Sequence, residues 1–294
     1  MIKDLFPSSP ATLFDALTTM LSSPLMQRSL LVAALVGVCA PVIGTYLVQR
    51  KLAMLGDGIG HVALTGVALG WLTGTFLNLT TPETLAIPGA LIVSLIGAVV
   101  LEIIRLSGKT ESDVALAILF YGGIAGGVLL IGFAGGTSSQ LNSYLFGSLA
   151  SVSKFDVWTT VGLATIILTI GLGLSPALYA VCNDEEFAKA SGLPVRSLNL
   201  LIAVLAAFTV AISMRVVGSL LISALMIVPV ATAQVVTTSF KRTLSLAMFI
   251  GATVAVTGLV FTYFFDVSPG ATIVVFTIFL YGGAHLLRTL FKRI

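Results

Sequence analysis

Long apolar segments dominate the chain, and short polar connections separate them. About 20 helical residues cross the ~30 Å hydrocarbon core of a bilayer, because a helix rises about 1.5 Å per residue. The pattern therefore predicts nine membrane-spanning helices. Their expected ranges are 30–48, 56–74, 85–104, 114–133, 157–179, 198–214, 217–230, 244–265 and 271–287. The seventh is short and ends at Pro229, so two half-helices are an alternative there, and the segment 141–152 is interpreted as a re-entrant or interfacial helix.

The composition supports a membrane protein. Hydrophobic residues make up 57% of the 294 positions, charged residues only 9%, and the mean hydropathy is +1.10, whereas a soluble domain carries about 25% charged residues. Within lipid, only helices and closed barrels satisfy the backbone groups, and the short alternating segments of barrel strands do not dominate here. No connection is long enough for a soluble domain. We therefore predict an all-α polytopic transmembrane bundle that forms one domain over residues 1–294.

The basic residues predict the orientation of the bundle. Cytoplasmic connections of membrane proteins are enriched in Lys and Arg. Eleven of the fifteen basic residues follow odd-numbered spans or end the chain, which predicts an external N-terminus and a cytoplasmic C-terminus. These eleven are Arg50, Lys51, Arg105, Lys109, Lys189, Arg196, Lys241, Arg242, Arg288, Lys292 and Arg293, and the other four are Lys3, Arg28, Lys154 and Arg215.

Asp57 and His61 form the strongest candidate site. They lie four residues apart in the second predicted span, which places them on one helix face. An acid inside a bilayer costs roughly 2.5–3.5 kcal/mol on insertion scales, so such residues usually face a pathway in the bundle. Carboxylate and imidazole ligands suit Zn²⁺, Mn²⁺ or Fe²⁺. Alternatively, Asp57 caps the helix and His61 forms a hydrogen bond inside the bundle; two ligands also fall short of a complete site, so a second copy or other helices must supply the rest.

Other residues carry weaker signals. Gly56, Gly58 and Gly60 favour either tight helix packing or a break or bend of the second span around a site. His285, the only other histidine, is interpreted as packed or interfacial. The two cysteines, Cys39 and Cys182, give neither a disulfide framework nor a metal-binding spacing, so both are predicted to be packed small residues.

The stretch Ser107-Gly108-Lys109-Thr110 resembles the tail of a phosphate-binding P-loop, but Ile103 stands where that motif needs its first glycine. No strand is predicted before it. No serine–histidine or paired-carboxylate arrangement indicates catalysis either. We therefore predict no enzyme activity and no bound catalytic cofactor in this chain, and expect any ATP hydrolysis to occur in a partner subunit.

Two stretches resemble the permease family of zinc, manganese and iron ABC importers. The first is residues 50–70, Arg-Lys-Leu-Ala-Met-Leu-Gly-Asp-Gly-Ile-Gly-His-Val-Ala-Leu-Thr-Gly-Val-Ala-Leu-Gly. The second comprises residues 184–195, 198–199 and 216–233, with Pro229 near its end. Residues 144–148 and 268–274 fit the same family, so the resemblance extends from about residue 30 to 285.

The resemblance implies a multi-pass permease of a bacterial plasma membrane. It would act as a homodimer with cytoplasmic ABC ATPase subunits and an extracytoplasmic metal-binding protein, and import a divalent metal by alternating access. Zinc is the first expectation, with manganese or iron as alternatives; a secondary transporter driven by an ion gradient is the alternative of another class. Asp57 and His61 match the family's translocation-path ligands. By similarity to cobalamin and siderophore permeases, the ATPase-coupling segment is expected to include Pro229, Ala231, Thr232, Ala233, Lys241 and Arg242.

Overall fold

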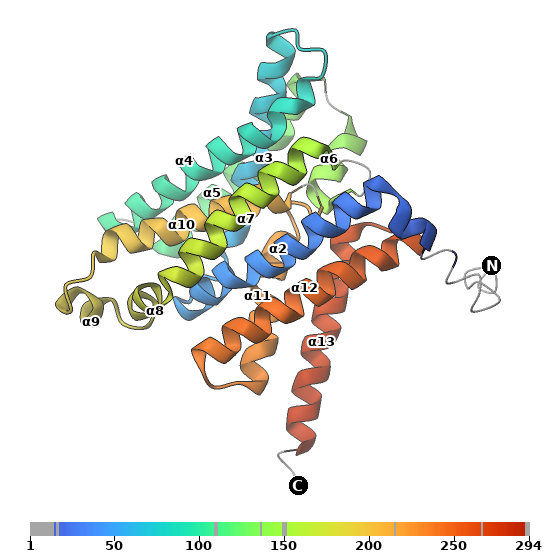
Figure 1. Ribbon diagram of the computed structural model, residues 1–294. Helices are drawn as coiled ribbons and strands as arrows, with labels where there is room; N and C mark the ends of the chain where they lie inside the picture. The colour runs from blue at the N-terminus through green and yellow to red at the C-terminus, as the bar shows by residue number, and fades with distance from the viewer. Residues whose placement is uncertain are drawn as a thin grey trace.

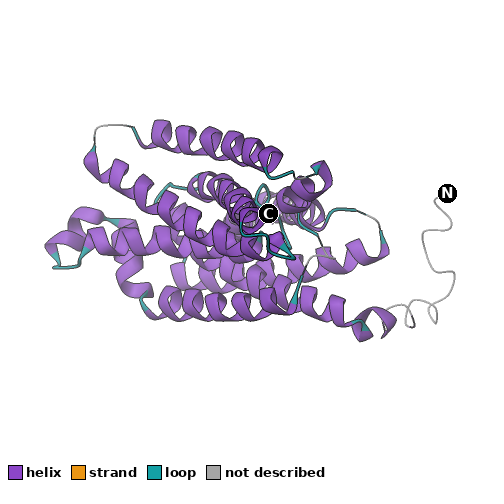
Figure 2. Ribbon diagram, turned by 90° about the horizontal axis from the view of Figure 1, so that it is seen from above, coloured by secondary structure: helices purple, strands orange, loops and turns teal. Residues whose placement is uncertain are grey.

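A computed structural model of the protein describes residues 15, 18–108, 111–135, 137–148, 152–214, 216–265 and 267–291. Within these residues all regular structure is helical, as Figures 1 and 2 show, so the prediction of an all-α bundle is confirmed. The elements are α2 (Pro24–Gln49), α3 (Leu55–Phe76), η2 (Pro82–Leu85), α4 (Ala86–Ser107), α5 (Ser112–Phe133), α6 (Ser138–Phe146), α7 (Lys154–Gly173), α8 (Ser175–Asn183), α9 (Glu185–Ala190), α10 (Val195–Ser213), α11 (Ile222–Val236), α12 (Phe240–Phe264) and α13 (Pro269–Phe291).

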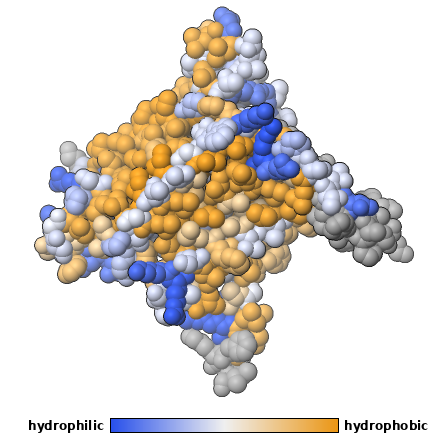
Figure 3. Space-filling view, in the orientation of Figure 1, coloured by the Kyte–Doolittle hydropathy of each residue, from blue (hydrophilic) through white to orange (hydrophobic). Residues whose placement is uncertain are grey.

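Eight of these helices are long and apolar enough to cross a membrane, and the apolar helix α11 is shorter, at 15 residues. Much of their surface is apolar and exposed. Only 22% of the most apolar stretch of α5, and 22% of that of α13, is buried inside the chain. Figure 3 shows this surface as a hydrophobic body with hydrophilic residues near its ends. Such a surface suits lipid or a second membrane protein, not water.

Two predicted spans differ from the structure, and both differences involve proline or glycine. The range 157–179 contains two helices, because α7 ends at Gly173 and Pro176 lies in the first turn of α8. Proline is tolerated there, since a backbone N–H in the first turn of a helix has no partner within the helix. The range 217–230 is displaced: Gly218 has a φ of +90°, and α11 begins at Ile222. The predicted helix end at Pro229 is wrong, since α11 continues through Pro229 to Val236.

The segment before α11 is held by α6. The backbone N–H groups of Ser219 and Leu220 donate to the carbonyl oxygens of Tyr144 and Leu145, at 2.8 and 3.2 Å. Ser219 is fully buried. Non-helical backbone at membrane depth is tolerated where protein covers it. The helix α6 has nine residues, too short to span, as expected for the predicted range 141–152, of which residues 149–151 lie outside the described part.

Small residues let the helices approach closely. A Cβ atom at Gly37 of α2 would overlap the backbone of Gly251 on α12, and one at Gly66 of α3 would overlap that of Gly89 on α4. Such contacts are typical of packing between transmembrane helices. The helix α3 is unbroken from Leu55 to Phe76, so the predicted alternative of a break at Gly56, Gly58 and Gly60 is wrong. These glycines lie against neighbouring helices instead.

The apparent P-loop tail is the end of a helix. Ser107 is the last residue of α4, and Gly108 follows with a left-handed φ of +64°. This geometry is that of a helix C-terminus. Lys109 and Thr110 lie outside the described residues, as do four other basic residues, Lys3, Arg215, Lys292 and Arg293.

Cys182 of α8, beyond the end of the α7 span, is expected to alkylate slowly and with an unusual pH dependence. Burial raises the pKa of its thiol from 9.0 to about 12, and only the thiolate is nucleophilic. Its reaction rate with N-ethylmaleimide should therefore keep rising about tenfold per pH unit from pH 9 to pH 11. Peptide mapping by mass spectrometry measures this rate, with the unfolded chain as control. Levelling of the rate near pH 9 in the folded protein would contradict the expectation.

Candidate functional site

Asp57 and His61 lie in the first two turns of α3, one turn apart on the same face. The carboxylate of Asp57 accepts a hydrogen bond from the hydroxyl of Ser223 on α11. Met54, at the N-cap position, makes no side-chain capping bond to α3. An acid in the first turn still interacts favourably with the helix dipole. Asp57 therefore connects two helices far apart in sequence, in addition to its place at a helix start.

His61 is buried, with 1% of its surface exposed. Its ring meets the ring of Phe120 on α5 edge to face, with the centroids 4.2 Å apart. Its Nδ1 atom has no hydrogen-bond partner among the described residues. A buried polar atom without a partner costs roughly 1–3 kcal/mol. The alternative of a hydrogen bond inside the bundle is therefore not observed for Nδ1, which is free to bind a metal ion or water.

The site has too few ligands in one chain. Among the described residues, no group of three or more His, Cys, Asp or Glu side chains could hold a metal ion. Asp57 and His61 supply one carboxylate and one imidazole, and Ser223 adds a hydroxyl beside the carboxylate. Divalent zinc takes four ligands in its usual sites. Two such side chains leave a metal ion incompletely coordinated, whereas a complete cage would hinder its release.

A groove of about 300 Å³ runs beside the pair on α5, lined by Met54, Asp113, Leu116, Ala117, Phe120 and Tyr121. Phe120 lines this groove and also contacts His61. Its ring therefore separates the imidazole from the groove. Tyr121 is 70% exposed, so the groove opens on the outer surface of the chain.

For the metal-transport role that the sequence resemblance implies, replacing Ser223 with alanine is expected to weaken uptake without unfolding the protein. The hydroxyl fixes one oxygen of Asp57, and loss of a residue that orients a metal ligand typically lowers metal affinity about 10- to 100-fold. The apparent Km for metal uptake should rise by about tenfold. Thr262→Ala is the matched control, because its hydroxyl donates within its own helix, to the carbonyl of Leu259, and has no other partner among the described residues. Equal Km values for the two variants would contradict a role for Ser223.

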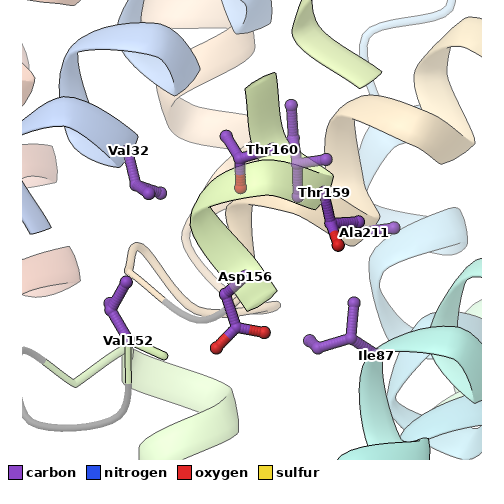
Figure 4. Close-up of a pocket in the computed structure, with 8 residues that line it drawn as sticks. Val32, Ile87, Val152, Asp156, Thr159, Thr160 and Ala211 are labelled. Carbon is purple, nitrogen blue, oxygen red and sulfur yellow. The ribbon is translucent and has the colours of Figure 1, made fainter. Parts of the chain in front are cut away.

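Another acid, Asp156, is buried away from this pair and has a structural role. It lies at the start of α7 beside a cavity of about 10 Å³ whose lining includes Val32 and Ile87 (Figure 4). Both the backbone N–H and the hydroxyl of Ser153 donate to one Asp156 oxygen, at 2.9 and 2.8 Å. The Asp156 N–H donates in return to the Ser153 hydroxyl, which completes a capping box. The acid therefore caps α7, and its surroundings hold room for about one water molecule.

The residues expected to contact an ATPase are not all accessible. Pro229, Thr232 and Ala233 are buried within α11, and Ala231 is half-buried. Lys241 and Arg242 are exposed at the start of α12. In Figure 1, α9 and the turn between α11 and α12 both lie at the end of the molecule opposite the start of α2. Phe187 of α9 is 65% exposed there. Two exposed segments are thus available there.

The remaining candidate, His285, is exposed on α13, and its ring stacks loosely on Tyr281 with centroids 6.2 Å apart. It takes no part in the Asp57–His61 site.

Comparison with known proteins gives matches over nearly the whole chain. A family model described as the ABC 3 transport family matches residues 22–287. The manganese transport system membrane protein MntC of Halalkalibacterium halodurans is 32% identical over 261 residues, or 89% of this chain and 85% of that protein. The manganese import system permease protein ScaB of Streptococcus gordonii is 30% identical over 249 residues, or 85% and 86% of the two chains. Among solved structures, a chain of PsaBC from Streptococcus pneumoniae in complex with Fab superposes with a TM-score of 0.81 at 30% identity, covering 92% of this chain and 95% of that one.

Proposed function

Because the chain belongs to the ABC 3 transport family, the multi-pass permeases of metal ABC importers in bacterial plasma membranes, we propose that it carries a divalent metal ion past Asp57 and His61. The observation that carries this proposal is the buried imidazole of His61, whose Nδ1 has no partner among the described residues. It shares a helix face with Asp57, whose carboxylate is the one acid in the first turn of α3.

We propose manganese and zinc as the transported metals, on equal terms. Carboxylate and hydroxyl oxygens favour manganese, and imidazole suits zinc. Zinc is the first expectation from the sequence, but the relatives MntC and ScaB are both named for manganese. Iron remains the third member of this group. Competition between the metals during uptake decides among them.

We propose that two copies of the permease assemble with cytoplasmic ATPase subunits and an external metal-binding protein. The incomplete ligand set of one chain supports a second copy, because a paired site supplies two carboxylates and two imidazoles. The structural likeness to PsaBC supports the same family assembly. The mechanism would be alternating access: closure of the ATPase dimer on ATP rocks the two permeases about their interface.

We propose one domain with nine membrane crossings, an external N-terminus and a cytoplasmic C-terminus. Eight helices meet the length requirement alone. The ninth crossing would combine α11 with the buried non-helical stretch around Gly218, whose neighbours Val217 and Ser219 are both fully buried. Lys241 and Arg242 at the start of α12 support a cytoplasmic position for that turn.

The ATPase contact has two candidate surfaces, and a pair of variants distinguishes them. The turn before α12 offers Lys241 and Arg242, and α9 offers the exposed ring of Phe187. Aromatic residues are enriched at protein interfaces, and truncation of an interface hot spot costs at least 2 kcal/mol, about 30-fold in affinity. We expect Phe187→Ala to weaken co-purification of the ATPase by about that factor, and the double variant Lys241→Ala/Arg242→Ala to weaken it mainly at low salt. Unchanged co-purification in both would place the contact elsewhere.

The experiment that tests the function is uptake into proteoliposomes. They would contain this chain with its candidate ATPase and metal-binding protein, and receive ⁵⁴Mn²⁺ or ⁶⁵Zn²⁺ with and without ATP. ATP-dependent accumulation of either metal supports the proposal. Accumulation that proceeds without ATP and follows an imposed ion gradient would support a secondary transporter instead. Absence of uptake of manganese, zinc and iron alike would overturn the proposal.

A further inference from the structure

A cluster of charged residues outside the metal path joins four elements. One oxygen of Glu185, at the start of α9, accepts from Nη2 of Arg50, after α2, at 2.8 Å. Nη2 of Arg105, on α4, lies 3.5 Å from the same oxygen, and Nδ2 of Asn199, on α10, donates to it at 3.1 Å. Arg105 also pairs with Glu102, at 3.1 Å.

A cavity of about 280 Å³ lies at this cluster, lined by Gln49, Arg50, Lys51, Arg105, Val181, Cys182, Asn183 and Glu185. Its volume is several times the about 30 Å³ that a water molecule occupies in the liquid. Three cationic side chains line it against one carboxylate, and the cluster keeps one excess positive charge when Glu102, which pairs with Arg105 from outside the lining, is included. A cation is therefore disfavoured in this cavity, and an anion is favoured.

The arginines retain unused hydrogen-bond donors at this cavity. Each guanidinium carries five N–H donors in a planar fork. Among the described residues, the side-chain hydrogen bonds of Arg50 and Arg105 all leave from Nη2. The side chain of Arg50 is only 5% exposed and that of Arg105 17%, so the space open to their remaining donors is mainly the cavity. Planar guanidinium forks match the oxygens of a phosphate group.

The cavity lies where the membrane surface is expected. Gln49 is the last residue of α2, and α4 ends at Ser107, so the lining residues sit at the ends of two candidate spans. Lys51 is exposed beside the two arginines, in a left-handed backbone conformation with a φ of 59°, which is uncommon for a residue other than glycine. Basic pockets between transmembrane helices at this level suit the headgroups of anionic lipids.

We propose that this cavity binds a phosphate-bearing anion, with Arg50, Lys51 and Arg105 as its ligands. The phosphate group is the shared chemistry of two sources, the headgroup of an anionic phospholipid and phosphate dissolved in the adjoining water. Glu185 orients the two guanidinium groups, and the anion accepts from their free donors and from Lys51. The site is separate from Asp57 and His61 and does not depend on metal transport.

The test is native mass spectrometry of the purified full-length permease in detergent, titrated with phosphatidylglycerol or phosphatidylcholine. We expect phosphatidylglycerol to bind more tightly. Lys51→Gln should weaken that binding about fivefold and leave phosphatidylcholine unchanged. Lys189→Gln is the matched control, since Lys189 is an exposed lysine of α9 outside the lining. A parallel titration uses inorganic phosphate in the presence of phosphatidylcholine only.

The outcomes distinguish a lipid headgroup from dissolved phosphate, and both from a cavity that binds neither. Retention of phosphatidylglycerol that depends on Lys51 and resists added phosphate identifies a lipid site. A phosphate adduct that depends on Lys51, with no preference between the lipids, identifies a soluble anion at the same ligands. Equal binding of both lipids with no phosphate adduct would overturn the proposal. Equal losses in Lys51→Gln and Lys189→Gln would also overturn it, because they would indicate general surface charge.

Discussion

Alanine at position 61 is expected to lower ATP-driven uptake of manganese or zinc by at least about tenfold, while the protein stays folded. His61 is the only imidazole near Asp57, and its Nδ1 has no partner among the described residues. Removing it leaves a carboxylate and a hydroxyl, a set that binds transition metals more weakly than one with an imidazole. Initial uptake rates in the proteoliposomes measure the effect.

Two further variants separate metal binding from packing at this position. His61→Gln keeps much of the side-chain volume against Phe120 and should lose uptake nearly as fully as His61→Ala. His285→Ala is the matched control, because His285 is the only other histidine and is exposed on α13. Uptake by His61→Gln at the parent rate, with gel filtration showing a folded protein, would assign His61 to packing alone.

Helix positions follow closely from hydropathy in this chain, because every span must be long and apolar enough to cross the lipid. The predicted ranges 56–74 and 85–104 correspond to α3 (Leu55–Phe76) and α4 (Ala86–Ser107). The resemblance to metal importer permeases is also confirmed by the family match over residues 22–287. The errors arise at Pro176, Gly218 and Pro229, where backbone geometry decides and hydropathy carries no information. Pro229 continues a helix because the surrounding protein can satisfy the carbonyl that proline leaves free.

The site could be predicted only in part. Asp57 and His61 stand out because charged and polar side chains are rare inside a span. Ser223 lies 166 positions from Asp57, and no local pattern connects them. Phe120 likewise resembles any apolar residue of a span until its ring is seen against His61. In the coupling segment, Thr232 and Ala233 are buried within the bundle, which the sequence did not indicate, and their contact with an ATPase stays a prediction. Residue type cannot tell which partner a small side chain approaches.

Alanine at position 44 is expected to destabilise the bundle strongly, although it adds only one methyl group. A Cβ atom there would overlap the carbonyl oxygen of Met226 on α11, which is backbone and cannot rotate away. Overpacking typically lowers the free energy of unfolding by 1–3 kcal/mol, and we expect about 3 kcal/mol or more here, because the clashing atom belongs to the backbone. The helices α2 and α11 must then separate. Thermal unfolding monitored by gel filtration measures the loss.

The same substitution should also disturb the metal path, because it displaces α11. Met226 lies one turn from Ser223 on that helix, and its Sδ atom would lie 3.4 Å from a Cβ atom at Gly56 of α3. A shift of α11 away from α2 therefore displaces the hydroxyl that holds Asp57. Gly162→Ala on α7 is the matched control, since nothing lies within 4 Å of its added methyl group, and alanine favours a helix by up to about 1 kcal/mol over glycine. We expect Gly44→Ala to lose both stability and uptake and Gly162→Ala to keep both. Equal melting temperatures of the two variants would contradict this expectation, because they would mean that a methyl group fits between α2 and α11.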